Sequence, residues 1–246
     1  MTTTTNVGHA VLERDAWLET QQAHLLREKE LTRLRDALSA ERRALPWLEI
    51  TEGYEFDGPA SSDGSGTKSL LDLFEGRRQL LIYHFMYGPD WGAEGCPTCS
   101  FWADNFDRVI VHLEHRDTSM KVVSRATLPQ IEAYQQRMRW GFDWYSSGRS
   151  SFNLDMGVSH RPADVEAGVA RYNFGTQEVS GDESPGISAF TRTDDGRIFL
   201  TYQTFARGLE LVNGAYHLLD LTSKGRDEDG LPWPQAWLRR HDAYED

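Results

Sequence analysis

Leu80-Leu-Ile-Tyr-His-Phe-Met86 opens the stretch of sequence that decides the fold. It is followed by a loop over residues 87–95 and then by Cys96-Pro-Thr-Cys-Ser-Phe-Trp-Ala-Asp104. The apolar run predicts a buried strand, which the glycine- and proline-containing loop ends. Pro97 suits the first position of a helix, where its missing N–H costs nothing. The only two cysteines of the chain therefore lie at a predicted strand-to-helix junction.

The Cys96-Pro-Thr-Cys99 motif at this junction has the chemistry of a redox site. Free N–H groups and the dipole of a helix start stabilise a thiolate and lower the pKa of a thiol there. A thiolate is the nucleophile in disulfide exchange, and a second thiol within reach resolves the mixed disulfide. We expect Cys96 to be the attacking thiolate and Cys99, one turn into the helix, to be the resolving thiol. The alternative is a pair of buried, inert thiols.

The composition excludes several classes of protein. A length of 246 residues allows one large domain, or one domain with an extension, and the net charge of −12 argues against a nucleic-acid surface. No run of about 18 apolar residues predicts a membrane span, and the start Met-Thr-Thr-Thr-Thr-Asn lacks the features of a signal peptide. Two cysteines do not make a disulfide scaffold. We expect a cytoplasmic protein whose cysteines stay mostly reduced.

The N-terminal part predicts one long helix. Residues 11–45 contain neither glycine nor proline, and Pro46 ends the run. Leucines and Trp17 recur at spacings of three, four or seven, which indicates an apolar stripe. We expect a tail and helix over residues 1–45 packed on their own domain. The alternative is a dimerisation arm, which would make the protein a homodimer.

The rest of the chain alternates between strands and helices. The expected strands span residues 47–56, 80–86, 120–124 and 142–146, with a hairpin over 187–202 turning at Asp195-Gly196. Helices are expected over 97–115, 128–140 and 209–219, with another at 162–172 inside an insert over residues 148–186. This order predicts the α/β thioredoxin-like arrangement, a mixed sheet with helices on both faces. Residues 46–246 then form effectively one domain, with a C-terminal tail over 222–246.

Several stretches of the sequence carry a family resemblance, namely residues 28–36, 41–47, 83–91, 95–104, 123–126, 202–208 and 218–227. In these stretches the sequence resembles the thioredoxin-like proteins grouped as domain of unknown function 899, which are labelled predicted dithiol–disulfide oxidoreductases. The resemblance covers residues 16–244 and implies a thioredoxin-like fold with an N-terminal helical extension.

A more distant resemblance to peroxiredoxins suggests further site residues. Those proteins carry a proline and then a threonine or serine before the peroxidatic cysteine. Pro89 matches the proline, but Ala93 replaces the hydroxyl residue that orients the peroxide. Thioredoxins also place a cis-proline before the strand that faces the motif, and Pro185 is the candidate here.

Four further side chains are candidates for supporting roles. His84, in the first core strand, would tune the thiolate or shuttle protons; otherwise it is a core histidine. Trp91, in the loop, would shape the substrate surface or simply pack in the core. Arg125, at the end of a core strand, would stabilise the thiolate, as would Arg207; a surface salt bridge is the alternative for each.

Acid–base and metal alternatives involve further residues. Asp104 and Glu94 would move protons for Cys99. His112 and His115 follow the cysteines at a spacing close to that of a zinc finger. However, the gap between the two histidines is shorter than the usual three to five residues, and the cysteines lie at a helix start. We therefore expect no metal and no cofactor, and regard the histidines as surface or interface residues.

These observations lead to three functional hypotheses. The first is a thiol–disulfide oxidoreductase that acts on a disulfide-containing protein or a small substrate and is reduced by an external thiol system. The second is a thiol peroxidase, in which Cys96 becomes a sulfenic acid and condenses with Cys99; the substitution at Ala93 counts against it. The third is a non-enzymatic binding protein that uses the long helix and the 148–186 insert, because a fold does not fix a function.

Overall fold

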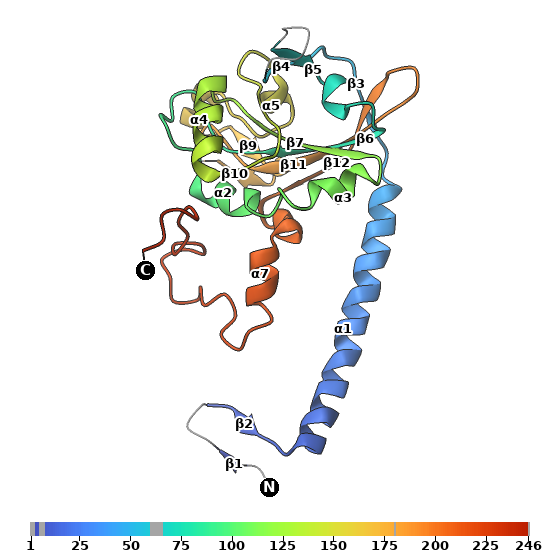
Figure 1. Cartoon of the computed structure of the whole chain (residues 1–246), viewed down its shortest axis with the longest axis vertical. Helices are drawn as coiled ribbons and strands as arrows, with labels where there is room; N and C mark the ends of the chain where they lie inside the picture. Colours follow the sequence, from blue (N-terminus) through green and yellow to red (C-terminus); the bar gives the residue numbers. More distant parts are fainter. Residues whose placement is uncertain (1–2, 5–7, 60–65, 180, 246) are drawn as a thin grey trace. The chain divides into compact units, whose positions relative to one another are not determined.

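The computed structural model describes residues 3–4, 8–59, 66–179 and 181–245. The chain divides into two compact units, Met1–Pro46 and Trp47–Asp246. Figure 1 shows the secondary-structure elements of both units. The described helices include none that is long and apolar enough to cross a membrane.

The first unit consists of a short antiparallel strand pair and one long helix. Strand β1 (Thr3–Thr4) pairs with β2 (Ala10–Val11), and helix α1 spans Arg14–Arg43. The helix ends before Pro46 as predicted, and arginines in its last turn complement the helix dipole. Leu26, Leu34 and Leu38 on this helix are more than half exposed. Whether the helix packs on its own domain or on a second copy stays a prediction.

The second unit is built on a mixed eight-stranded sheet in the order β3-β12-β11-β6-β7-β8-β4-β5. The parallel centre comprises β6 (Gln79–His84), β7 (Thr118–Ser124) and β8 (Trp144–Ser146). The hairpin of β11 (Gly186–Arg192) and β12 (Ile198–Phe205) pairs antiparallel to β6. This confirms the predicted α/β thioredoxin-like class, with its strand–helix–strand centre and closing hairpin.

The strand expected over residues 47–56 is wrong as a single element. It forms β3 (Leu48–Ile50), which pairs with β12, and β4 (Glu55–Asp57), which pairs with β5 (Thr67–Ser69) and β8. The two pieces therefore lie toward opposite edges of one sheet. A turn separates them, closed by a hydrogen bond from the Tyr54 N–H to the Glu52 carbonyl. Local alternation of apolar residues does not reveal which distant strand each piece pairs with.

The helix expected over residues 97–115 is also interrupted. It forms α2 (Pro97–Ala103) and α3 (Ile110–Glu114). The Asn105 side chain donates hydrogen bonds to the carbonyls of Phe101 and Trp102, which occupies acceptors at the end of α2. The helix predicted at Pro129 is present as α4 (Leu128–Met138) and begins with a capping box.

Two apolar clusters cover the two faces of the sheet. The first contains Tyr83 of β6 together with buried residues of α2 and α4, and the second contains Leu80 and Ile82 of β6. Alternate residues of a strand point to opposite faces, so β6 contributes to both clusters. The second cluster also holds residues of 3₁₀ helix η1 (Asp72–Phe74) and of α5 (Phe152–Asp155). Helices thus lie on both faces, as the thioredoxin-like arrangement requires.

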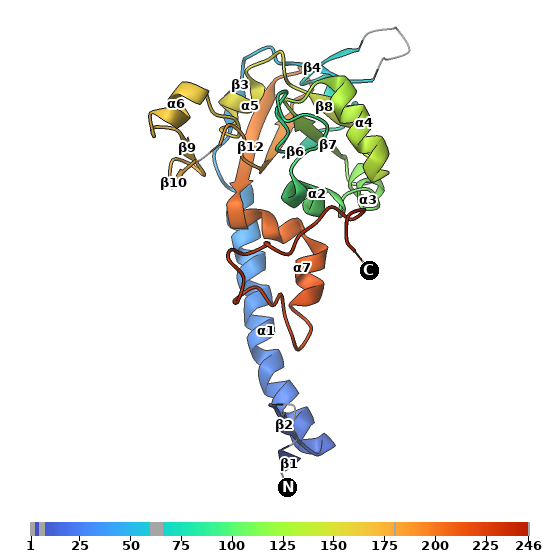
Figure 2. The ribbon, with the colours of Figure 1, turned by 90° about the vertical axis from the view of Figure 1, so that its left-hand side faces the viewer.

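The insert contains α5, α6 (Pro162–Glu166) and a hairpin of β9 (Arg171–Tyr172) with β10 (Gln177–Glu178) (Figure 2). The helix predicted over residues 162–172 is therefore shorter than expected. The rings of Tyr172 and Phe174 pack on Phe205 at the end of β12. Beyond β12 follow η2 (Ala206–Val212) and α7 (Gly214–Leu219), and the described part of the tail contains no helix or strand.

Candidate active site

The two cysteines lie at the start of α2, where the sequence predicts them. Cys96 is the N-cap residue and Pro97 is the first helical residue. The Cys99 N–H points at the Cys96 sulfur, with 3.5 Å between the two atoms. The Cys96 carbonyl accepts the Ser100 N–H at 3.0 Å and so starts the helix. Both cysteines are free thiols, Cys96 partly exposed and Cys99 buried.

The surroundings of Cys96 favour its thiolate. A hydrogen bond from the Cys99 thiol is the main cause that lowers the pKa of Cys96 to about 7. Burial opposes this shift, while the N–H groups of Cys99 and Thr98 and the Thr98 hydroxyl add to it. At neutral pH a large share of Cys96 is therefore the reactive anion.

The surroundings of Cys99 have the opposite effect. Burial, followed by the neighbouring Cys96, raises the pKa of the Cys99 thiol well above its ordinary value. The Met86 N–H lies 3.4 Å from the Cys99 sulfur, and the Tyr83 hydroxyl lies 3.4 Å from the Cys99 carbonyl oxygen. Cys99 thus stays protonated while it donates to Cys96. The two thiols therefore differ, because the surroundings favour the thiolate of Cys96 and the protonated form of Cys99.

Contacts from two other segments hold the loop before Cys96. The Gln130 amide donates hydrogen bonds to the carbonyls of Pro89 and Gly92, and the Arg240 guanidinium donates one to the Gly95 carbonyl. A Cβ atom at Gly95 would lie 2.6 Å from the buried ring of Phe85, so this position requires glycine. Helix α4 and the C-terminal tail therefore fix the backbone from which the Cys96 thiol projects.

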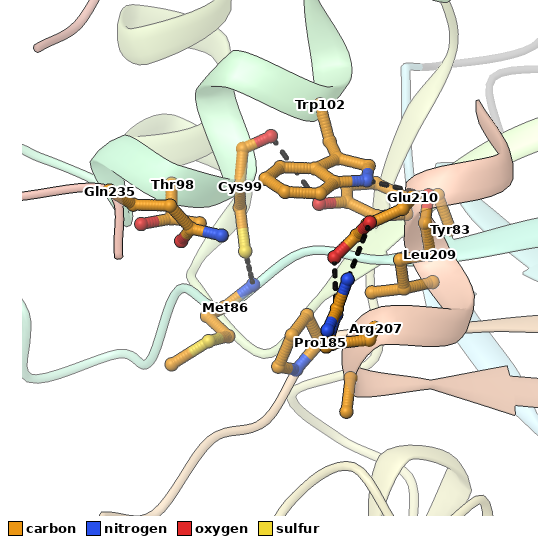
Figure 3. Close-up of a pocket in the computed structure, with 11 residues that line it drawn as sticks. Tyr83, Met86, Thr98, Cys99, Trp102, Pro185, Arg207, Leu209, Glu210 and Gln235 are labelled. Atoms are coloured by element: carbon orange, nitrogen blue, oxygen red, sulfur yellow. Dashed lines mark hydrogen bonds and ion pairs between the residues drawn. The ribbon is translucent and has the colours of Figure 1, made fainter. Parts of the chain in front are cut away.

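A cavity of about 250 Å³ lies beside Cys99. Figure 3 shows that its walls come from the end of β6, from α2, from η2 and from separate residues of the insert and the tail. The lining residues are Tyr83, Met86, Thr98, Cys99, Trp102, Pro185, Ala206, Arg207, Leu209, Glu210 and Gln235. Sequence analysis missed most of this wall, because it is assembled from segments far apart in the chain that carry no shared motif.

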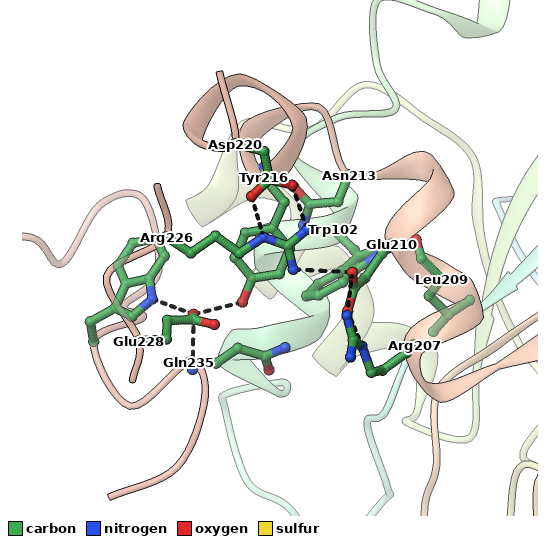
Figure 4. Close-up of polar contacts among 11 residues, drawn as sticks. Trp102, Arg207, Leu209, Glu210, Asn213, Tyr216, Asp220, Arg226, Glu228 and Gln235 are labelled. Atoms are coloured by element: carbon green, nitrogen blue, oxygen red, sulfur yellow. Dashed lines mark hydrogen bonds and ion pairs between the residues drawn. The ribbon is translucent and has the colours of Figure 1, made fainter. Parts of the chain in front are cut away.

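Polar contacts attach η2 to α2, and the tail to η2 and α7. The Trp102 indole N–H donates a hydrogen bond to the Leu209 carbonyl at 2.8 Å. Glu210 forms ion pairs with Arg207 and Arg226, as Figure 4 shows. In the tail, the Glu228 carboxylate accepts hydrogen bonds from the Tyr216 hydroxyl, the Trp237 indole and the Gln235 backbone N–H. These contacts give the outer wall of the cavity a defined position.

Pro185 is placed as predicted, but the expected cis bond is wrong. The residue lines the cavity with Cys99 and directly precedes β11. Its peptide bond is trans, since the described residues include no cis peptide bond. The preceding residue, Ser184, is anchored by a hydrogen bond from its N–H to the Val158 carbonyl, so the chain enters β11 as a continuation of the insert.

His84 lies away from the thiols. It neighbours Tyr83 in β6 but points to the other face of the sheet, where its ring packs on Phe152. The side chain is fully buried, and burial lowers its pKa to about 3. Its Nε2 atom lies 2.7 Å from the Ser188 hydroxyl, and its Nδ1 atom has no hydrogen-bond partner among the described residues. The structure therefore places a neutral core histidine here.

The other candidate side chains from the core and loops form ion pairs or apolar contacts with neighbouring residues. Arg125 forms ion pairs with Asp182 and with the buried Glu183 of the insert. Arg207 lies at the rim of the cavity and is paired with Glu210. Trp91 is half-buried and packs against the same apolar cluster as Cys96. Their proposed effects on the thiolate or the substrate stay predictions.

The acid–base and zinc candidates are not gathered at the thiols. Glu94 pairs with Arg137 and Arg240, and Asp104 accepts hydrogen bonds from Trp140 and His241. The two histidines of the zinc alternative, His112 and His115, lie on α3 and at its end. Within the described ranges, no three His, Cys, Asp or Glu side chains are grouped so that they could hold a metal ion.

The fold and this site define a thioredoxin-like protein with a Cys-x-x-Cys pair at the start of the helix after the central strand. Its sequence identifies the family to which it belongs. The chain belongs to the family described as bacterial protein of unknown function (DUF899), which matches residues 6–244. No curated protein is similar in sequence to the chain.

Solved structures of peroxiredoxins are distantly similar to this chain. Peroxidoxin BcpB of Mycobacterium tuberculosis is 11% identical, with 67% of this chain and 96% of that chain covered and a TM-score of 0.42. A cysteine-to-serine mutant of Xanthomonas campestris peroxiredoxin Q is 13% identical, with 69% and 98% covered and a TM-score of 0.42. Reduced 2-Cys peroxiredoxin of Plasmodium vivax is 13% identical, with 70% and 94% covered and a TM-score of 0.39.

Proposed function

We propose that this protein is a thiol–disulfide oxidoreductase in which Cys96 attacks and Cys99 resolves. The observation that carries the proposal is the asymmetry of the pair. The pKa of Cys96 is lowered to about 7, whereas burial raises the pKa of Cys99 well above its ordinary value. Since the thiolate is the nucleophile, the two sulfurs have different roles before any substrate arrives.

The reaction begins at the partly exposed sulfur of Cys96. Its thiolate attacks one sulfur of a substrate disulfide, whose S–S bond breaks, and the departing thiolate takes up a proton. Cys99 then loses its proton and attacks the Cys96 sulfur, which releases the second substrate thiol. Two electrons pass to the substrate, and the protein is left with a Cys96–Cys99 disulfide. An external thiol system must reduce this disulfide before the next cycle.

The position of the pair supports both steps. The Cys96 sulfur lies 3.5 Å from the backbone nitrogen of Cys99, so both thiols belong to one helical turn. Cys99 is buried and therefore protected from outside reagents until Cys96 carries the mixed disulfide. Helix N–H groups also stabilise the Cys96 thiolate that is regenerated when the external thiol system reduces the disulfide.

Trapping of the mixed disulfide tests the assignment of roles. Reduced protein is mixed with oxidised glutathione, quenched in acid and analysed by mass spectrometry. Cys99→Ser should accumulate a stable adduct on Cys96, while Cys96→Ser should form almost none. Similar adducts on both variants would refute the division of roles. Disulfide exchange would be refuted if neither variant formed an adduct with oxidised glutathione or with the uncharged aromatic disulfide 4,4′-dithiodipyridine.

A parallel assay compares consumption of hydrogen peroxide. The loop around the exposed Ala93 lacks the hydroxyl that the peroxiredoxin pattern places there. We expect slow peroxide turnover relative to reduction of the disulfide. Peroxide consumption that depends on Cys96 and exceeds disulfide reduction would favour the thiol peroxidase instead.

A further inference from the structure

We propose that the cavity beside Cys99 binds an apolar side group carried next to the sulfur that Cys96 attacks. The substrates would then be disulfides flanked by an apolar group of about the size of a phenylalanine side chain. This inference rests on the disulfide exchange proposed above and adds the class of substrate to it.

The size of the cavity sets the size of the occupant. An apolar cavity of about 150 Å³ accommodates benzene, whereas sites for drug-sized ligands and cofactors occupy about 300–1,000 Å³. The cavity here measures about 250 Å³. It is large enough for one aromatic or branched aliphatic group, and it is smaller than the usual range for a site that holds a nucleotide or flavin.

The lining determines the chemistry of the occupant. Trp102, Met86, Leu209, Pro185 and Ala206 present ring, thioether and aliphatic surfaces to the cavity (Figure 3). Removing such apolar surfaces from water is favourable. An apolar occupant removes the water from them, whereas a hydrated group does not. An apolar occupant is therefore preferred over a polar one of similar size.

The charged groups at the cavity are already paired. Glu210 accepts hydrogen bonds from Arg207 at 2.8 Å and from Arg226 at 3.0 Å (Figure 4). Arg226 also forms an ion pair with Asp220 at 2.8 Å, so two carboxylates balance the two guanidinium groups. A charged substituent would lose its hydration without gaining an unpaired counter-ion. The cavity should therefore disfavour acidic and basic groups as well as hydrated neutral ones.

The cavity is close enough to the reacting sulfurs to select the substrate. Cys99 forms part of its wall, and the backbone nitrogen of this residue lies 3.5 Å from the Cys96 sulfur. Thr98, between the two cysteines, also lines the cavity. A group attached within a few bonds of the substrate sulfur can thus enter the cavity while that sulfur meets Cys96.

The test uses unreactive thioether analogues, so that it does not depend on any exchange reaction. Isothermal titration calorimetry measures the binding to reduced protein of two blocked dipeptides, phenylalanyl-S-methylcysteine and seryl-S-methylcysteine. A second arm compares benzyl methyl sulfide with hydroxyethyl methyl sulfide. We expect the apolar member of a pair to bind about ten-fold more tightly or better, as is typical of apolar pockets. A preference for the phenylalanyl dipeptide in the first arm indicates that the apolar group belongs to a peptide substrate. A preference for benzyl methyl sulfide in the second arm indicates that it belongs to a small organic disulfide.

Variants that fill the cavity provide the second readout. Leu209→Phe and Gln235→Phe place extra bulk in opposite walls and should erase the preference, provided that circular dichroism shows a native fold. Leu211→Phe is the matched control, since Leu211 belongs to the same η2 segment but is 55% exposed. Equal binding of both members in both arms, or a preference that survives in a folded filling variant, would overturn the inference. Disulfide exchange would stand in that case, because trapping of the mixed disulfide measures it separately.

Discussion

The hydrogen bond between the two thiols gives the sharpest prediction. The Cys99 thiol is the main cause of the lowered pKa of Cys96, which is about 7. A hydrogen bond to a charged group is worth about 1.5–3 kcal/mol, and one pKa unit corresponds to about 1.36 kcal/mol. Cys99→Ala should therefore raise the pKa of Cys96 by about one to two units, to about 8–9.

This shift has a measurable effect on reactivity. At pH 7 the thiolate fraction of Cys96 should fall from about one half to about 1–10%. The remaining thiolate is intrinsically more nucleophilic, because the Brønsted coefficient for thiol attack is about 0.4–0.5. The two effects combine to slow alkylation at pH 7 by about two- to eight-fold. Cys99→Ser keeps a hydroxyl donor and should show a smaller change.

The assay follows alkylation by iodoacetamide across a range of pH, with mass spectrometry to identify the modified residue. Cys96→Ser serves as the control, because the buried Cys99 should react slowly in it. The reasoning is refuted if the midpoint for Cys96 is the same in Cys99→Ala as in the natural protein. It is also refuted if the natural protein already titrates at the ordinary thiol value of about 8.5.

Three other predictions concern the scaffold. Burial raises the folded-state pKa of Glu183 from 4.5 to about 7, so its stabilising effect is complete below pH 4.5 and lost as the pH rises through 7. As the pH rises between those values, the unfolding free energy of Glu183→Gln, measured with urea, should rise by about 3 kcal/mol relative to that of the natural protein. A difference between the two proteins that does not change with pH would contradict this. Gly95→Ala places a Cβ atom 2.6 Å from the Phe85 ring and should lower the unfolding free energy by about 1–3 kcal/mol, whereas Gly53→Ala, in open space, should not. Tyr172→Phe removes two hydrogen bonds to backbone beside the cavity and should cost about 1–2 kcal/mol by the same measurement; an unchanged stability would show that these bonds contribute nothing.

The sequence reveals the centre of the fold because the signals there are local. The apolar run before the loop forms β6, and Pro97 marks the start of α2. The Asp195-Gly196 turn forms the hairpin of β11 and β12. Each of these features depends on residues within one short window. The position of the two thiols follows from the same windows.

Features that depend on pairing between distant segments were not foreseen. Alternation could not show that β3 and β4 join different strands, or which face of β6 lies toward the thiols. Arg125 carries a charge that suits a thiolate, but its position beside a buried carboxylate is visible only after folding. The cavity wall could not be predicted for the same reason, since Pro185, Leu209 and Gln235 meet only in the folded chain.

A redox titration tests the central claim most directly. The natural protein is equilibrated in glutathione buffers of graded potential, its free thiols are alkylated, and the products are resolved by mass spectrometry. We predict one reversible two-electron transition between a dithiol and an intramolecular Cys96–Cys99 disulfide, which is absent from Cys96→Ser and from Cys99→Ser. A pair that stays reduced at every potential, or that forms only disulfides between molecules, would contradict the account.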